Sequence, residues 1–103
     1  MAQVRHIVML TLKDELTASE KAAHAQRIKT ELEGLKSVIP GIETFTVHID
    51  ALPSSNVSLV FDSIFVSEKA LSEYQTHPEH VKVAEYIHSI RKDRSCIDFY
   101  VDE

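Results

Sequence analysis

The chain has 103 residues, of which 44% are hydrophobic and 26% are charged. This is the size of one domain and the composition of a globular protein, so a disordered chain or a coiled coil is not expected. We therefore predict a single domain over residues 1–103. The 16 acidic and 11 basic side chains leave a net charge of −5, which argues against nucleic acid as a partner because phosphate binding requires a basic surface.

The sequence favours a cytoplasmic protein. The longest early apolar run, Ile7–Leu10, is too short for a signal peptide or a membrane span. Cys96 is the one cysteine, so no intrachain disulfide is expected and a reducing compartment fits. Its apolar neighbours favour Cys96 as a small core residue.

The first half of the chain predicts a strand, a helix and a second strand. Val4–Leu12 alternates with period two but is apolar on both faces, so both faces should be covered. Thr17 and Glu20 form a capping box at the start of a helix that Pro40–Gly41 ends. Ile42–Ile49 alternates again and predicts the second strand. The inward residues of the helix should be Ala25, Ile28, Leu32, Leu35 and Ile39.

The middle of the chain begins with a loop. Ala51–Asn56 is rich in Ser and Pro and should be irregular. Val57–Val66 follows as a longer strand with apolar residues on both faces. Ser67 then caps a short helix that runs from Glu68 to about Gln75.

The last third predicts a helix and a final strand. Pro78 suits the first position of a helix, which should run to about Lys92. The basic run Arg91–Arg94 is interpreted as the solvated end of that helix, where it suits the helix dipole. Ser95–Val101 should close the chain as a strand. The inward residues of the helix should be Val83, Ala84, Ile87 and Ile90.

The element order βαββααβ predicts an α+β fold of ferredoxin-like type, an antiparallel sheet with its helices on one face. The other face would carry apolar side chains exposed to water, among them Ile7, Met9, Val60 and Ile64. A second copy of the chain is the simplest cover for such a face. We therefore predict a homodimer in which two sheets close into a dimeric α+β barrel.

Three side chains are candidates for chemistry. His80 lies on the inward stripe of its helix, where shielding from water favours a neutral imidazole that can accept a proton. Tyr74 on the preceding helix could reach the same space with its hydroxyl. His6 alternates in phase with Val8 and Leu10, so these three residues should point under the helices.

Each candidate also has a structural interpretation that the sequence leaves open. His80 fits a hydrogen-bonded core histidine, and His6 fits a structural residue at the start of a strand. Tyr74 fits an amphipathic core residue, and His77, before Pro78, fits a helix-entry residue. We expect no metal site, because His77 and His80 lack a third partner. The lack of a glycine-rich phosphate loop argues against a nucleotide cofactor, and we expect no cofactor.

The sequence resembles the stress-responsive A/B barrel (Dabb) family over nearly its whole length. The resemblance rests on three short segments and one motif, Tyr-x-x-His-Pro-x-His. The segments are His6–Leu10, Ile39–Ile42 and Asp62–Phe65. The residues of the motif are Tyr74, His77, Pro78 and His80. The resemblance implies a ferredoxin-like protomer and a dimeric barrel, and the family name implies a role in the stress response.

One branch of the family, that of the plant olivetolic acid cyclase, is similar to this chain at His6, Tyr74, His77 and His80. This resemblance implies cofactor-free chemistry with His80 as the general base and Tyr74 as the hydrogen-bond donor. The branch carries a histidine where this chain has Leu59, which makes a different substrate the expectation.

Three functions follow as hypotheses. The first is a protein with a pocket for a small apolar or aromatic ligand, formed with His6, Val8, Leu10 and His77 next to the pair Tyr74 and His80. The second is a polyketide cyclase-like enzyme with cofactor-independent cyclase or lyase-type proton transfer. The third is a structural stress protein without a ligand, in which side chains would fill the space around His80. The lack of tryptophan argues against the haem-acting monooxygenases of neighbouring barrel families.

Overall fold

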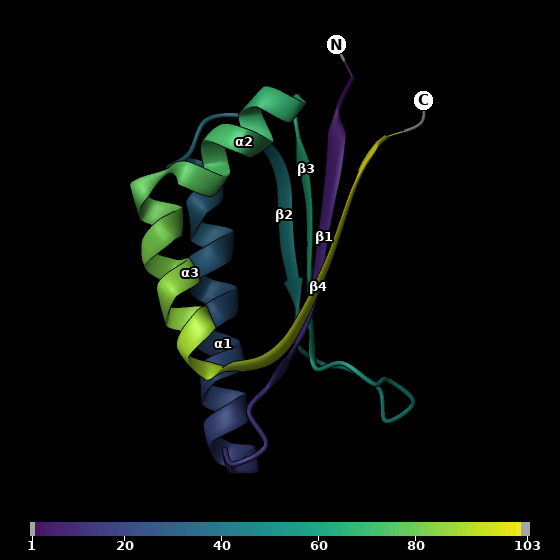
Figure 1. The fold of residues 1–103 in the computed structure, drawn as a ribbon, viewed down its shortest axis with the longest axis vertical. Coiled ribbons are helices and arrows are strands. Elements are labelled where there is room, and N and C mark those ends of the chain that lie inside the picture. Colours follow the sequence, from purple (N-terminus) through teal and green to yellow (C-terminus); the bar gives the residue numbers. More distant parts are fainter. Residues whose placement is uncertain (1, 102–103) are drawn as a thin grey trace.

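Helices cover one face of a four-stranded antiparallel sheet in the computed structural model, which describes residues 2–101 (Figure 1). The strands lie in the order β2-β3-β1-β4, the ferredoxin-like arrangement that the sequence predicts. The elements are β1 (Val4–Leu12), α1 (Ala18–Gly34) with a 3₁₀ turn (Leu35–Ser37), β2 (Ile42–His48), β3 (Leu59–Phe65), α2 (Glu68–Thr76), α3 (Pro78–Ile90) and β4 (Arg91–Tyr100). The α+β fold class is confirmed.

The capping box at the start of α1 is confirmed. The Thr17 hydroxyl accepts a hydrogen bond from the Glu20 amide at 3.1 Å, and the Thr17 amide donates to the Glu20 carboxylate at 2.8 Å. All the inward positions predicted for this segment are buried. After the 3₁₀ turn the chain reverses at Gly41, whose φ of 91° lies in the region that only glycine adopts without strain.

Burial along β1 follows the predicted alternation. Val4, Val8, Leu10 and Leu12 are buried under the helices together with His6, whereas Met9 on the other face is exposed. Ser67 caps α2 through a hydrogen bond from the Ala70 amide to its hydroxyl. The buried residues of β1 and of the helices belong to one hydrophobic core.

The boundary between α3 and β4 corrects the sequence prediction. The helix ends at Ile90 and not near Lys92, and the strand begins at Arg91 and not at Ser95. Arg91–Arg94 is therefore strand and not the solvated end of a helix. The reason is a long-range pairing, because Leu12 of β1 pairs with Arg91 and main-chain bonds to β1 replace further helical turns.

Other strand ends differ from the prediction by one or two residues, and β4 ends at Tyr100 and not at Val101. β3 is shorter than the predicted strand Val57–Val66, yet the Ser58 amide still donates to the Leu10 carbonyl and the Val66 amide to the Gly41 carbonyl. β2 ends at His48, one residue before the predicted end at Ile49.

The expectation that Cys96 is a core residue is wrong. Cys96 is exposed, because the helices do not cover β4, whose residues are exposed or half-buried along the whole strand. On the side of the sheet away from the helices, Ile97 is 58% exposed, Phe99 42% and Met9 38%. We call this side the open face.

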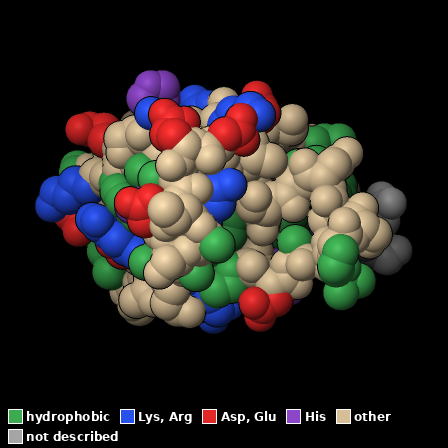
Figure 2. Space-filling model, turned by 90° about the horizontal axis from the view of Figure 1, so that it is seen from below, with side chains coloured by type: hydrophobic (Ala, Val, Ile, Leu, Met, Phe, Trp, Pro, Cys, Tyr) green, Lys and Arg blue, Asp and Glu red, His purple; other side chains and the backbone are tan. Residues whose placement is uncertain are grey.

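Charge is unevenly distributed over the surface. Seen from below, acidic and basic side chains gather over the helices, and the side of the β2–β3 loop shows mainly hydrophobic and uncharged groups (Figure 2). No helix within residues 2–101 has the length and apolar character needed to cross a membrane.

Candidate functional site

A cavity of about 690 Å³ lies between the sheet and α3, within the size range of small-molecule pockets, about 300–1,000 Å³. We call it the helix-side cavity. Most of the wall surface is apolar, and seven of the fifteen lining residues carry titratable side chains. The lining residues are His6, Val8, Leu10, Leu32, Phe45, Phe61, Tyr74, His80, Val81, Ala84, Glu85, Ile87, His88, Arg91 and Arg94.

Five of the six side chains singled out from the sequence meet in this cavity: His6, Val8, Leu10, Tyr74 and His80. His77 is not among the lining residues. Its ring caps α3, where Nδ1 accepts a hydrogen bond from the Glu79 amide at 3.1 Å. This position matches the helix-entry interpretation of His77.

Tyr74 and His80 are in direct contact. Their ring centroids lie 4.2 Å apart with the planes inclined at 39°. Tyr74 is only 3% exposed, and the structure gives its hydroxyl no hydrogen-bond partner among residues 2–101. Burial raises the pKa of Tyr74 above its ordinary value, although the positive charge of Arg94 acts in the opposite direction. The phenol therefore stays protonated and can donate a hydrogen bond to a ligand.

His80 is held as a neutral base. Its Nδ1 lies 3.2 Å from the carbonyl oxygen of Gln75, and because a carbonyl only accepts, Nδ1 carries the proton. Burial lowers the pKa of His80, an effect that the bond to Gln75 partly offsets and the charge of Arg94 strengthens. Nε2 is then left with a free lone pair, the requirement for a general base.

His6 has a partner that the sequence did not reveal. It lies opposite Asp98 in the β1–β4 pairing, and its Nδ1 donates a hydrogen bond to the Asp98 carboxylate. Nδ1 is therefore protonated and Nε2 is unprotonated in the neutral ring. No local motif predicts this pair, because it depends on the register between the first and last strands.

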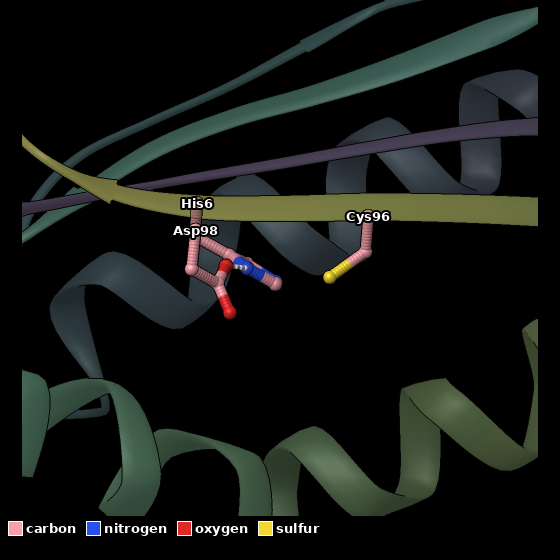
Figure 3. A group of neighbouring side chains, drawn as sticks. All are labelled: His6, Cys96 and Asp98. Carbon is pink, nitrogen blue, oxygen red and sulfur yellow. Dashed lines mark hydrogen bonds and ion pairs between the residues drawn. The ribbon is translucent and has the colours of Figure 1, made fainter.

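His6, Cys96 and Asp98 are the group in the described chain that could hold a metal ion. Their ligand atoms all lie within 4.8 Å of one another, and the three side chains extend from the sheet toward the helices (Figure 3). Nitrogen, sulfur and oxygen donors suit zinc. However, the carboxylate of Asp98 already fixes the imidazole of His6. We still predict that these three residues hold no metal.

Sequence reasoning missed four polar residues of the lining: Glu85, His88, Arg91 and Arg94. Arg94 pairs with Leu10 and so faces the helices. Arg91 lies with its guanidinium nitrogen Nη2 3.2 Å from Nδ1 of His88. The sequence pattern places both arginines at a helix end, so the error in this one boundary also conceals the charged side of the cavity.

Comparison with known proteins gives a family match over almost the whole chain. The model of the stress responsive A/B barrel domain (Dabb) matches residues 4–101. The stress-response A/B barrel domain-containing protein DABB1 of Arabidopsis thaliana is 28% identical over 101 residues. That match covers 97% of this chain and 48% of the relative, so the chain spans about half the length of the curated relative it matches.

Two solved structures illustrate the shared fold. A dimeric protein of unknown function and ferredoxin-like fold from Bacteroides fragilis is 27% identical, with a TM-score of 0.90 and 96% of each chain covered. The hydroxynitrile lyase of Passiflora edulis is 17% identical, with a TM-score of 0.80 and coverage of 98% of this chain and 94% of that chain. The second likeness concerns the fold alone.

Proposed function

The chain belongs to the stress-responsive A/B barrel domain family, and from this membership and the helix-side cavity we propose that it forms a homodimer that binds a small apolar or aromatic molecule. The ligand lies beside His6, Tyr74 and His80. The family's name, stress responsive A/B barrel domain, supports a role in the stress response. We place the protein in the cytoplasm, because its one cysteine fits a reducing compartment.

The cavity carries this proposal. The space of about 690 Å³ opens to solvent on one side and lies within the size range of small-molecule pockets. Apolar residues such as Leu32, Phe45 and Phe61 line it, and the hydroxyl of Tyr74, which has no partner within residues 2–101, offers a hydrogen bond. An apolar wall with a few placed polar groups is the usual construction of a ligand site.

Titration with N-phenyl-1-naphthylamine, a neutral apolar fluorophore, tests the proposal. The expected result is saturable enhancement of fluorescence with about one probe bound per chain. A linear increase without saturation would contradict a defined pocket.

The homodimer is supported by the open face. Apolar residues from three strands share this face, and several are exposed in the single chain. Burying them against the same face of a second copy removes this apolar surface from water. The similar protein from Bacteroides fragilis is described as dimeric. The residues of the expected interface are Ile7, Met9, Val60, Ile64, Ile97 and Phe99.

A second candidate function is cofactor-free proton transfer of the cyclase or lyase type. It is favoured by the contact between Tyr74 and His80 and by the proton on His80 Nδ1. Nε2 of His80 would remove a proton next to a carbonyl group, while the Tyr74 hydroxyl donates a hydrogen bond to the oxygen of the resulting enolate. A base in this position typically contributes about 10²–10⁴-fold.

Deuterium exchange at the acidic carbon of benzoylacetone, followed by NMR, tests this chemistry without knowledge of the natural substrate. The protein should accelerate exchange, and His80→Gln should lower that acceleration about 100-fold. Tyr74→Phe should have a smaller effect. Equal rates for the wild type and His80→Gln would remove His80 as the base.

A purely structural role has less support. It would require side chains to fill the space around His80, whereas that residue lines the cavity. The probe titration distinguishes the two functions, because a filled interior offers no saturable site.

A further inference from the structure

We propose that the ligand of the helix-side cavity is an apolar carboxylic acid and that Arg94 binds its carboxylate. The inference rests on the proposed ligand-binding function and adds the chemical class of the ligand. It also assigns a specificity-determining residue that lies outside the family motif. Three properties of Arg94 support the inference: its orientation toward the cavity, the charges around it and the absence of a carboxylate partner within residues 2–101.

The register of β4 directs Arg94 toward the cavity. Arg94 pairs with Leu10, and Cys96 and Asp98 follow it at alternate positions of the same strand. Alternate residues of a strand share a face, and the side chains of Cys96 and Asp98 extend toward the helices (Figure 3). The side chain of Arg94 lines the cavity accordingly.

The cavity wall is richer in positive charge than the whole protein. The chain carries a net charge of −5, whereas the wall carries two arginines and one glutamate, Arg91, Arg94 and Glu85. The carboxylate of Asp98 lies next to this wall, but it is engaged by the ring of His6. The positive charge of Arg94 also acts on the phenol of Tyr74 and the imidazole of His80. Tyr74 and His80 line the same cavity as Arg94, so an anion bound by Arg94 would share that cavity with the two groups that could act on it.

Within the described residues, Arg94 has no carboxylate partner, in contrast to Arg5 and Arg27. Arg5 forms an ion pair with Asp62 and Arg27 with Glu31, whereas the structure gives Arg94 no ion pair and no side-chain hydrogen bond within residues 2–101. The guanidinium group offers a planar fork of donors that fits a carboxylate with two parallel hydrogen bonds. A ligand carboxylate would supply the missing acceptor.

The surroundings favour a carboxylate over a phosphate. Glu85 adds a negative charge to the cavity wall, so a group with two negative charges would be repelled more strongly than a group with one. A molecule with an apolar body and one carboxylate fits this wall. Its body would pack against the apolar lining residues, and its carboxylate would lie at β4.

Fluorescence titration with cis-parinaric acid and its methyl ester tests the inference, because the two probes differ only in the charged group. The wild type should bind the acid more tightly than the ester. Arg94→Gln should weaken binding of the acid about 10-fold or more, as expected for a hydrogen bond to a charged group, and should change binding of the ester less than twofold. Arg94→Lys should retain part of the preference.

Two variants control for charge and position. Glu85→Gln removes the repelling carboxylate and should strengthen binding of the acid but not of the ester. Lys69→Gln removes one positive charge from an exposed position on α2 and should leave both probes unaffected. Circular dichroism of each variant checks that the fold is retained.

The outcomes separate the two proposals. If both probes bind but Arg94→Gln leaves the preference for the acid unchanged, the role of Arg94 is overturned and the ligand cavity stands. Equal binding of acid and ester by the wild type overturns the carboxylate class in the same way. If neither probe binds, the ligand cavity itself fails, and this inference fails with it.

Discussion

Asp98 on β4 lies opposite His6 on β1, and its carboxylate accepts the hydrogen bond that Nδ1 of His6 donates. His6 is only 4% exposed, so Asp98→Ala leaves a nearly buried N–H group without its partner. We expect the free energy of unfolding to fall by about 1–3 kcal/mol, measured by urea denaturation. Asp93→Ala on the same strand removes only a long, exposed hydrogen bond from Thr11 and should cost less than about 0.5 kcal/mol. Equal losses in the two variants would contradict the role of the His6–Asp98 pair.

Gly41 cannot accept a side chain without strain. Its φ is 91°, and a Cβ atom there would come within 2.7 Å of the Cβ of Ala70. We expect Gly41→Ala to lower the free energy of unfolding by about 1–3 kcal/mol, the range for a residue held in an unfavourable backbone region.

Gly34 is the matched control for this substitution. It ends α1 with helical dihedral angles, and a methyl group on its Cα atom would meet only open space. Gly34→Ala should therefore stabilise the chain by about 0.5–1 kcal/mol. Thermal unfolding of the two variants would show opposite shifts, and a stabilising Gly41→Ala would contradict the turn geometry.

Acid should destabilise the protein partly through His80. Burial lowers the pKa of His80 in the folded chain below its ordinary value of 6.5. Above about pH 6.5, His80 is neutral in both the folded and the unfolded chain. As the pH falls through it, the unfolded chain binds a proton that folded His80 resists, so the free energy of unfolding declines.

His80→Gln isolates this contribution. The variant cannot bind that proton in either state, so its stability should decline less than that of the wild type between about pH 7 and about pH 5. Urea denaturation across this range provides the comparison. Parallel curves for the two proteins would show that the pKa of His80 does not differ between the folded and unfolded states.

The open face should mediate self-association. Ile97 is 58% exposed and lies at the centre of β4 on this face. A negative charge there would have to be buried between two sheets, so Ile97→Asp should convert the expected dimer into monomer at micromolar concentration. Ser72→Asp, an exposed substitution of equal charge on α2, should leave the dimer intact. Sedimentation velocity gives the mass of each variant, and a monomeric wild type would contradict the proposed assembly.

Local pattern was sufficient to predict most of the fold. The alternation of Val4–Leu12, the capping box at Thr17 and the proline at position 78 each act within a few residues, and the structure confirms the elements they predict. The end of α3 depends on an interaction between distant segments. A basic run such as Arg91–Arg94 is compatible with a helix end or an exposed strand, and only pairing with β1 decides between them.

The candidate site also contains residues that the local sequence pattern predicts and residues that it does not. His80 and Tyr74 could be placed in one cavity from helical spacing, because each follows the apolar stripe of its own helix. Asp98 and Arg94 reach the same region only through the register of β4 against β1, which no short motif encodes. Cys96 was misassigned for a related reason, since the sequence does not reveal that the helices leave β4 uncovered.

Filling the cavity tests the ligand-binding proposal most directly. Ala84 lines the helix-side cavity from α3, so the side chain of Ala84→Phe would occupy space that the ligand needs. Ser89→Phe is the control, because it adds the same side chain at an exposed position of that helix. Binding of N-phenyl-1-naphthylamine to both variants and to the wild type is the measurement. The account predicts one saturable site per chain that Ala84→Phe weakens about 10-fold or more, equivalent to about 1.4 kcal/mol, and that Ser89→Phe retains. Undiminished binding to Ala84→Phe would contradict it.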